Sequence, residues 1–328
     1  MSKGKVTRFF KKYFWEGQKL DDTQLEALKE LSHDASLTQK LLVKYRRFVG
    51  LLIPALIVQS LWWMQAIRHD YFSLFPERYL MSITMIFGAT VAGMTSEGGG
   101  AVAFPVMTLA LAIAPGVARD FSLMIQATGM SCASFTIIWM KIKLENNSVV
   151  FCSIGAIAGM ILGLEVIDEL LTPAQKKLGF VCIWFSFAFS LFLLNREHKR
   201  KTYDQIQNLN AWKRSFLVFA GFLGGIFSAV AGSGVDICSF SVLTLLFRVS
   251  EKVATPTSIL LMAFNSLVGC YWKTFMMGGL EEDAWGFLKV CAPVVVIFAP
   301  LGSFLSSHFH RQVLAFLVYI LDTIALVG

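Results

Sequence analysis

Long apolar runs separated by short polar stretches cover the chain from Leu51 to its last residue. A helix that crosses a bilayer needs about 20 mostly apolar residues, and most of these runs approach that length. The pattern therefore predicts an all-α protein with several membrane-spanning helices. We distinguish apolar segments at residues 51–67, 80–97, 101–114, 121–140, 149–164, 178–194, 215–231, 236–247, 254–275, 286–305 and 312–328.

Two of these segments, 101–114 and 236–247, are too short to span a bilayer comfortably, and each follows a cluster of small residues. The two clusters are Gly98, Gly99, Gly100 and Gly232, Ser233, Gly234. Glycine adopts backbone angles that other residues avoid. We therefore predict that each short segment is one half of a broken or re-entrant helix. The alternative is that these glycines only let helices pack closely, as small residues often do in membranes.

The two clusters also mark an internal repeat. Each lies between an apolar helix and a shorter apolar segment, and the stretch 118–123 resembles 254–259. The offsets are 134 and then 136 residues, and five predicted segments separate corresponding points. Because five is odd, the second copy is expected to be inverted in the membrane. Inverted repeats around broken helices are typical of secondary transporters, which hold their substrate near the midplane.

Composition places the whole chain in the membrane class. Hydrophobic residues make up 55% of it and charged residues 16%, with a mean hydropathy of +0.62. A soluble core of this length does not bury that much apolar surface. The predicted organisation is a basic cytoplasmic head at 1–47, an extra N-terminal transmembrane helix and outer loop at 48–79, a first repeat at 80–195, a basic cytoplasmic linker at 196–214 and a second repeat at 215–328.

The distribution of basic residues predicts the orientation. If the head is cytoplasmic and each segment reverses direction, 22 of the 29 Lys and Arg residues fall on the inner side. This bias agrees with the positive-inside rule and predicts a multi-pass protein of the cell membrane with a cytoplasmic N-terminus. The basic residues lie beside apolar runs, so the net charge of +7 does not favour nucleic-acid binding.

The head interleaves lysines with aromatic residues between Phe9 and Trp15. This pattern suits a segment that lies on anionic lipid headgroups. A partly disordered tail is the alternative interpretation.

The helix breaks favour a small anionic substrate. A break inside a bilayer leaves backbone amides and carbonyls that need partners. The amides that begin the following half-helix carry the positive end of its dipole, where an anion is stabilised. We therefore expect both small-residue clusters to contribute to a substrate site.

Glu97 and Asp236 are the acidic residues closest to the breaks. A carboxylate in a membrane segment costs about 2.5–3.5 kcal/mol on insertion scales and is a functional candidate by default. Such a group can bind and release a proton during transport, so both residues are candidates for proton coupling. The alternative is an acid that faces an aqueous vestibule and stays ionised.

Polar side chains recur on two predicted helices. Ser122, Gln126 and Gly129 share one helical face by their spacing, and Ser258 and Asn265 share a face of the corresponding later helix. Hydroxyl and amide groups there can donate to substrate oxygens, although such groups often bridge helices instead. The candidate substrate-binding residues outside the two clusters are Ser96, Gln126, Thr257, Ser258 and Asn265.

The residue types of enzyme sites do not occur in the required patterns. The six cysteines fall inside predicted membrane segments without metal or disulfide spacing, and His308 and His310 have no nearby ligand partner. We also find no phosphate-binding loop and no nucleophile elbow. We therefore expect no enzymatic activity, no metal and no cofactor.

The first cluster with Pro105, Ala118 and Ser122 resembles the sulfite exporter TauE/SafE family of membrane proteins. The stretch 221–234, together with 254–258, is similar to the second motif of that family. The resemblance covers residues 80–328. It implies two related helical halves and secondary transport, usually export, of small sulfur-containing anions such as sulfite or sulfonates.

Three features depart from the family pattern. The second cluster is Gly-Ser-Gly rather than glycines alone, Ser239 stands where a proline is expected, and the basic head lies outside the common core. They leave the substrate open. The alternative function is a transport-inactive membrane scaffold or signalling protein that recruits partners through its basic head.

Overall fold

The computed structural model describes residues 45–95, 99–196 and 201–306, together with 316 and 320. The basic head therefore lies almost entirely outside the described residues, as does the last predicted segment. The α-helices are α4 (Arg46–Arg68), α5 (Phe75–Met94), α6 (Gly100–Pro105), α7 (Pro115–Trp139), α8 (Asn146–Leu162), α9 (Asp168–Leu170), α10 (Pro173–Arg196), α11 (Ala211–Ala231), α12 (Val235–Ser241), α13 (Glu251–Phe275) and α14 (Glu282–Ser306).

The remaining helical elements are short. A 3₁₀ helix, η2 (Tyr71–Leu74), precedes α5, and π-helical turns form η3 (Val106–Ala110), η4 (Gly163–Ile167) and η5 (Val242–Leu246). Within the described ranges there is no β-strand, only one isolated bridge between Tyr203 and Val249. Among the described residues, six helices are long and apolar enough to cross a membrane. The prediction of an all-α membrane protein is confirmed.

The order of elements recurs along the chain. The series α5, α6, η3, α7 and α8 is followed by α11, α12, η5, α13 and α14. A single offset of 136 residues relates α7, which begins at Pro115, to α13, which begins at Glu251. The two corresponding π turns, η3 and η5, are each followed two residues later by a non-glycine residue with a left-handed backbone, Ala112 and Arg248. The repeat thus extends to local backbone detail, while the inversion of one copy in the membrane stays a prediction.

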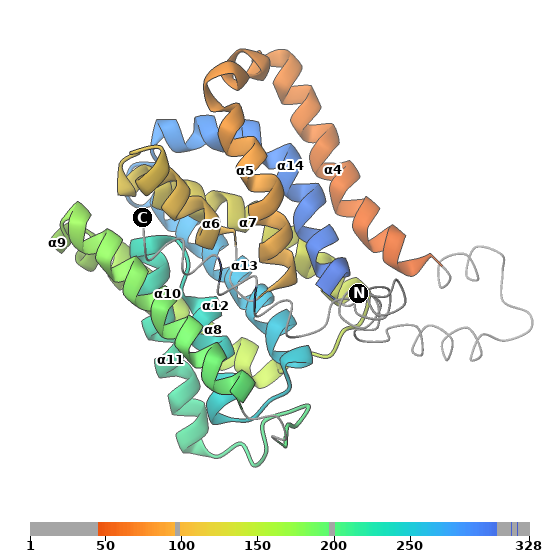
Figure 1. The fold of residues 1–328 in the computed structure, drawn as a ribbon, viewed down its shortest axis with the longest axis vertical. Helices are drawn as coiled ribbons and strands as arrows, with labels where there is room; N and C mark the ends of the chain where they lie inside the picture. The colour runs from red at the N-terminus through yellow and green to blue at the C-terminus, as the bar shows by residue number, and fades with distance from the viewer. Residues whose placement is uncertain (1–44, 96–98, 197–200, 307–315, 317–319, 321–328) are drawn as a thin grey trace, which may run out of the picture.

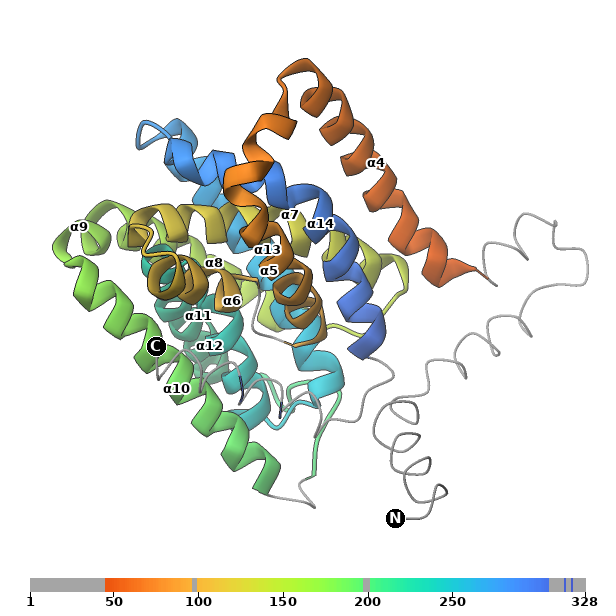
Figure 2. The same cartoon turned by 45° about the horizontal axis from the view of Figure 1, so that its top comes forward.

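The two copies exchange their outer helices. In Figure 1, α5 runs beside α14 in the upper part of the molecule, and α11 lies with α8 in the lower part, with α7 and α13 between them. Figure 2 shows the same grouping from another direction. The first helix of each series therefore packs on the last helix of the other series, so that the two copies interlock.

Glycines bring these exchanged helices into backbone contact. A Cβ added at Gly155 of α8 would overlap the carbonyl oxygen of Val218 in α11, and one at Gly93 of α5 would overlap that of Ala299 in α14. Gly221 and Gly302 are similarly close to the backbone of the facing helix. Close packing of small residues is a main source of helix association in membranes.

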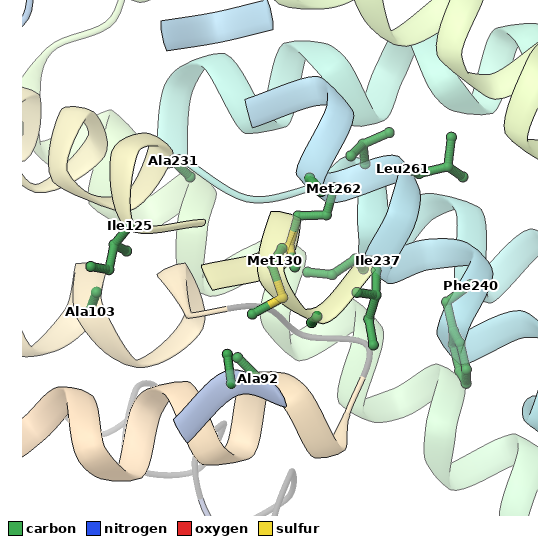
Figure 3. Packing of buried hydrophobic residues seen from close by; sticks show 14 of the residues in the cluster. Ala92, Ala103, Ile125, Met130, Ala231, Ile237, Phe240, Leu261 and Met262 are labelled. Atoms are coloured by element: carbon green, nitrogen blue, oxygen red, sulfur yellow. The ribbon is translucent and has the colours of Figure 1, made fainter. Parts of the chain in front are cut away.

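The centre of the molecule is apolar around the broken helices. Ala103 of α6, Ile125 and Met130 of α7, Ile237 of α12 and Met262 of α13 are buried and belong to one cluster (Figure 3). The two short helices are thus held by the two long central ones, which fixes the position of the chain at each break.

Two peripheral segments are attached by hydrogen bonds. The extra N-terminal helix, α4, donates from Gln59 Nε2 to the carbonyl oxygen of Pro293 at 2.6 Å. The expected linker is partly packed: Ile206 N donates to Glu145 Oε2 at 3.1 Å, and Ser250 N donates to the carbonyl oxygen of Tyr203 at 2.8 Å. It therefore joins two loops at one end of the helices.

The glycine contacts predict a packing effect. In Gly155→Ala, the methyl group meets backbone rather than a flexible side chain, so α8 and α11 must separate. Overpacking of this kind costs about 1–3 kcal/mol. We expect a lower melting temperature in detergent than for the wild type. Gly179→Ala is the matched control because a Cβ there meets no heavy atom within 4 Å; equal melting temperatures for both variants would contradict the interpretation.

Candidate functional site

The first break lies between α5 and α6. Helix α5 ends at Met94, Thr95 has extended backbone angles, and α6 begins at Gly100. Ser96, Glu97 and Gly98 lie outside the described residues. Gly99 and Gly100 are buried. A Cβ at Gly99 would make ordinary contact with Met85 Cε at 3.4 Å, so this residue faces apolar neighbours.

The second break lies between α11 and α12. Helix α11 ends at Ala231, and Gly232 follows with a φ of +80°, the left-handed conformation that commonly ends helices. Its N–H donates to the carbonyl oxygen of Ser228 at 2.8 Å. Helix α12 then begins at Val235. Both helices are broken at the clusters that the sequence indicated.

The amides at the second break already have protein partners. Gly234 N donates to Asp236 Oδ1 at 2.9 Å, and Val235 N donates to Ser228 Oγ at 3.1 Å. Ser233 Oγ donates to Asp236 Oδ2 at 2.9 Å. The expected exposed peptide groups are thus occupied here, and Asp236, which is fully buried, supplies the carboxylate that occupies one of them.

The two breaks meet at one place on α7. A Cβ at Gly100 would lie 3.3 Å from Ser233 Cβ and would overlap Gln126 Nε2. A Cβ at Gly232 would lie 3.1 Å from the carbonyl oxygen of Arg119. Of the residues singled out from sequence, Gly100, Gln126 and Ser233 are therefore neighbours, although more than 100 positions separate Gly100 from Ser233. Glycine at position 100 leaves the space that the Gln126 amide fills.

Polar groups at this meeting point lack partners among the described residues. The Gln126 Nε2 atom and Ser122 Oγ are both buried and make no hydrogen bond there. The Gln126 carbonyl oxygen, in contrast, accepts from Ser266 Oγ at 3.3 Å, which orients the amide. Buried polar groups are nearly always paired, so unpaired donors indicate a bound ligand or water. The site thus presents a hydroxyl and an amide N–H₂ that are available to an acceptor.

The predicted residues of α13 divide into two groups. Asn265 is buried, and neither of its amide atoms has a partner within the described ranges. Thr257 Oγ1 instead donates to the carbonyl oxygen of Val253 at 2.6 Å and accepts from Glu145 N at 3.0 Å. Ser258 Oγ donates to the carbonyl oxygen of Thr255 at 2.8 Å. These two hydroxyls make structural hydrogen bonds, as the alternative interpretation allowed.

A buried ion network was missed from the sequence. Arg119 Nη2 lies 2.8 Å from Asp120 Oδ1, and Lys273 Nζ lies 3.2 Å from Asp120 Oδ2. Arg119 Nη1 also pairs with Asp168, which in turn lies 2.6 Å from Lys176 Nζ. The predicted topology counts the three cations among the seven Lys and Arg residues on the outer side. The available signal was the adjacent Arg-Asp pair at the start of an apolar helix, because charges in such a place require partners.

The fold and the two helix breaks indicate a class of protein. Paired broken helices in repeated halves, which meet beside a few buried polar side chains, are characteristic of secondary transporters. Residues 80–328 match the family model described as sulfite exporter TauE/SafE, and the chain belongs to this family. The resemblance noted from the motifs is thereby confirmed. No curated protein and no solved structure gave a match.

Asp236 is expected to stabilise the second break. In Asp236→Ala, Gly234 N and Ser233 Oγ lose their acceptor, and each buried donor left unpaired costs about 1–3 kcal/mol. We expect a clearly lower melting temperature in detergent, and a smaller loss for Asp236→Asn, which keeps one acceptor oxygen. An alanine variant as stable as the wild type would contradict the assignment of this capping role.

Proposed function

We propose that this chain is a secondary transporter that exports a small anion, such as sulfite or an organosulfonate, held where the two breaks meet. The observation that carries the proposal is the pair of buried donors without described partners, Ser122 Oγ and Gln126 Nε2, beside Gly100 and Ser233. An oxyanion has the acceptor oxygens that these donors lack. Membership of an exporter family supports the direction of transport.

The repeat supports an alternating mechanism. Each copy contributes one broken helix to the meeting point, and the two long central helices, α7 and α13, pack against each other between the copies. In the proposed inverted arrangement, rocking of the group that contains α5 and α14 against the group that contains α8 and α11 opens the site to one side of the membrane and then to the other. The substrate remains near the midplane while the access path changes.

Proton coupling is the finer part of the proposal. Asp236 is fully buried and accepts hydrogen bonds from Ser233 Oγ and Gly234 N. Protonation of this carboxylate would weaken its hold on both donors and release them toward a bound anion. Glu97, in the segment outside the described residues, is the second candidate acid. Export of an anion together with a proton would thus use the geometry of the break itself.

The site can be tested by flux measurements. Full-length protein in liposomes is expected to move sulfite, methanesulfonate or acetate, and Gly100→Ala is expected to abolish that movement because the methyl group displaces the Gln126 amide. Gln126→Ala should lower flux about tenfold, since a hydrogen bond to a charged group contributes about 1.5–3 kcal/mol. Gly179→Ala is the matched control. Absence of flux for every anion with the wild type, or full flux with Gly100→Ala, would refute the proposed site.

Coupling can be tested separately with the Asp236→Asn variant. We expect this variant to lose flux driven by an imposed pH gradient while it still exchanges labelled for unlabelled anion across the membrane. An asparagine cannot exchange a proton but preserves most of the hydrogen-bond geometry. Unchanged gradient-driven flux would exclude Asp236 as the coupling group, and Glu97→Gln would then be measured in the same assay.

A further inference from the structure

The buried ion network lies at the end of a polar stripe that leads to the central site. Arg119, Ser122 and Gln126 are spaced i, i+3 and i+7 on α7, so they lie on one face of the helix. The rise of about 1.5 Å per residue separates successive members by roughly 4–6 Å. A small oxyanion could therefore pass from the guanidinium to the hydroxyl and then to the amide.

Only one donor of this stripe, the Arg119 guanidinium, is paired with carboxylates. Ser122 Oγ and Gln126 Nε2 have no hydrogen-bond partner in the part of the chain that the structure describes. A Cβ added at Gly232 would lie 3.1 Å from the carbonyl oxygen of Arg119, so the backbone of this network residue lies beside the second break. The ion network and the central site are thus adjacent rather than separate features.

Arg119 has two acidic partners, Asp120 and Asp168, which are held in different ways. Its Nε and Nη2 atoms lie 2.9 and 2.8 Å from Asp120 Oδ1. Asp120 is fully buried and also accepts from Lys273 Nζ and from Glu281 N at 3.1 Å. Because four donor atoms from three residues hold this carboxylate, it is a fixed counter-ion of the network.

Asp168 is held quite differently. Its carboxylate pairs with Arg119 Nη1 and with Lys176 Nζ, and its side chain is 15% exposed. It lies in the three-residue helix α9, directly after the π-helical turn η4 and before Leu171, whose backbone is extended. π-helical turns are frequent at functional sites. Asp168 therefore forms ion pairs with Arg119 and Lys176 from a short helix at the edge of the molecule.

We propose that Arg119 and Lys176 form a second anion-binding site, in which Asp168 is an internal counter-anion that the transported oxyanion replaces. A carboxylate bridging a guanidinium and an ammonium shows the charge and hydrogen-bonding pattern that a small oxyanion needs. When Asp168 withdraws, Nη1 of Arg119 and the ammonium of Lys176 are available together. This inference rests on the proposed function and adds a second binding site on the path to the central site.

The exchange has a thermodynamic consequence. An internal carboxylate that occupies the site competes with the substrate, and the apparent dissociation constant is the intrinsic one divided by the fraction of sites that are free. Removing the charge of Asp168 should therefore tighten anion binding. A purely structural ion network predicts the opposite pattern, because loss of Asp168 would lower stability without strengthening binding.

The test is equilibrium binding of ³⁵S-labelled sulfite to the purified full-length protein in detergent, with the melting temperature recorded for each variant. Asp168→Asn is expected to bind sulfite about tenfold more tightly than the wild type, since the competing charge is gone. Arg119→Lys is expected to bind about tenfold more weakly, because one ammonium cannot replace the planar fork of the guanidinium. If Asp168→Asn does not fold, Asp168→Ser replaces it.

Lys177→Gln is the matched control. Lys177 neighbours Lys176 in α10, but its Nζ donates to the carbonyl oxygen of Thr108 at 3.1 Å instead of to the network; wild-type affinity is expected. Unchanged or weaker binding by a folded Asp168 variant, or wild-type binding by Arg119→Lys, would overturn this inference alone. A wild-type protein that neither binds sulfite nor moves any tested anion would instead count against the proposed function.

Discussion

Close approach of backbone to neighbouring groups at glycine is the constraint on which this structure depends. It operates at two levels. Between helices, Gly93 and Gly155 let α5 and α8 contact the backbones of α14 and α11, which interlocks the two copies of the repeat. Within the centre, Gly100 leaves room for the Gln126 amide beside Ser233. The same residue type therefore both holds the helices together and leaves the space in which the site is proposed.

Buried polar groups that have hydrogen-bond partners differ in role from those that have none among the described residues. Thr257 and Ser258 use their hydroxyls in local or interhelical hydrogen bonds. Asp236 is bound to its own break by Ser233 and Gly234. Ser122 and the Gln126 amide nitrogen, by contrast, have no described partner. Because an unpaired buried donor is costly, the proposed acceptor site is placed at these two groups.

The buried charges of the ion network around Asp120 also need partners. Buried ions are stable only when they are paired and hydrogen-bonded, and Asp120 meets both conditions through Arg119, Lys273 and the amide of Glu281. The network fixes the start of α7 against the end of α13. It thereby sets the position of Ser122 and Gln126, which follow along the same helix.

Much of the fold could be predicted from the sequence because hydropathy and glycine spacing are local properties of a chain in a bilayer. The spanning helices, the two breaks, the repeat and the family all follow from runs of apolar residues and from the clusters at Gly98–Gly100 and Gly232–Gly234. Tertiary structure alone decided which polar groups are used. The contact between Gly100 and Ser233, the pairing of Arg119 with Asp168 and the capping role of Asp236 depend on how distant helices pack, and no spacing along the chain encodes that distance.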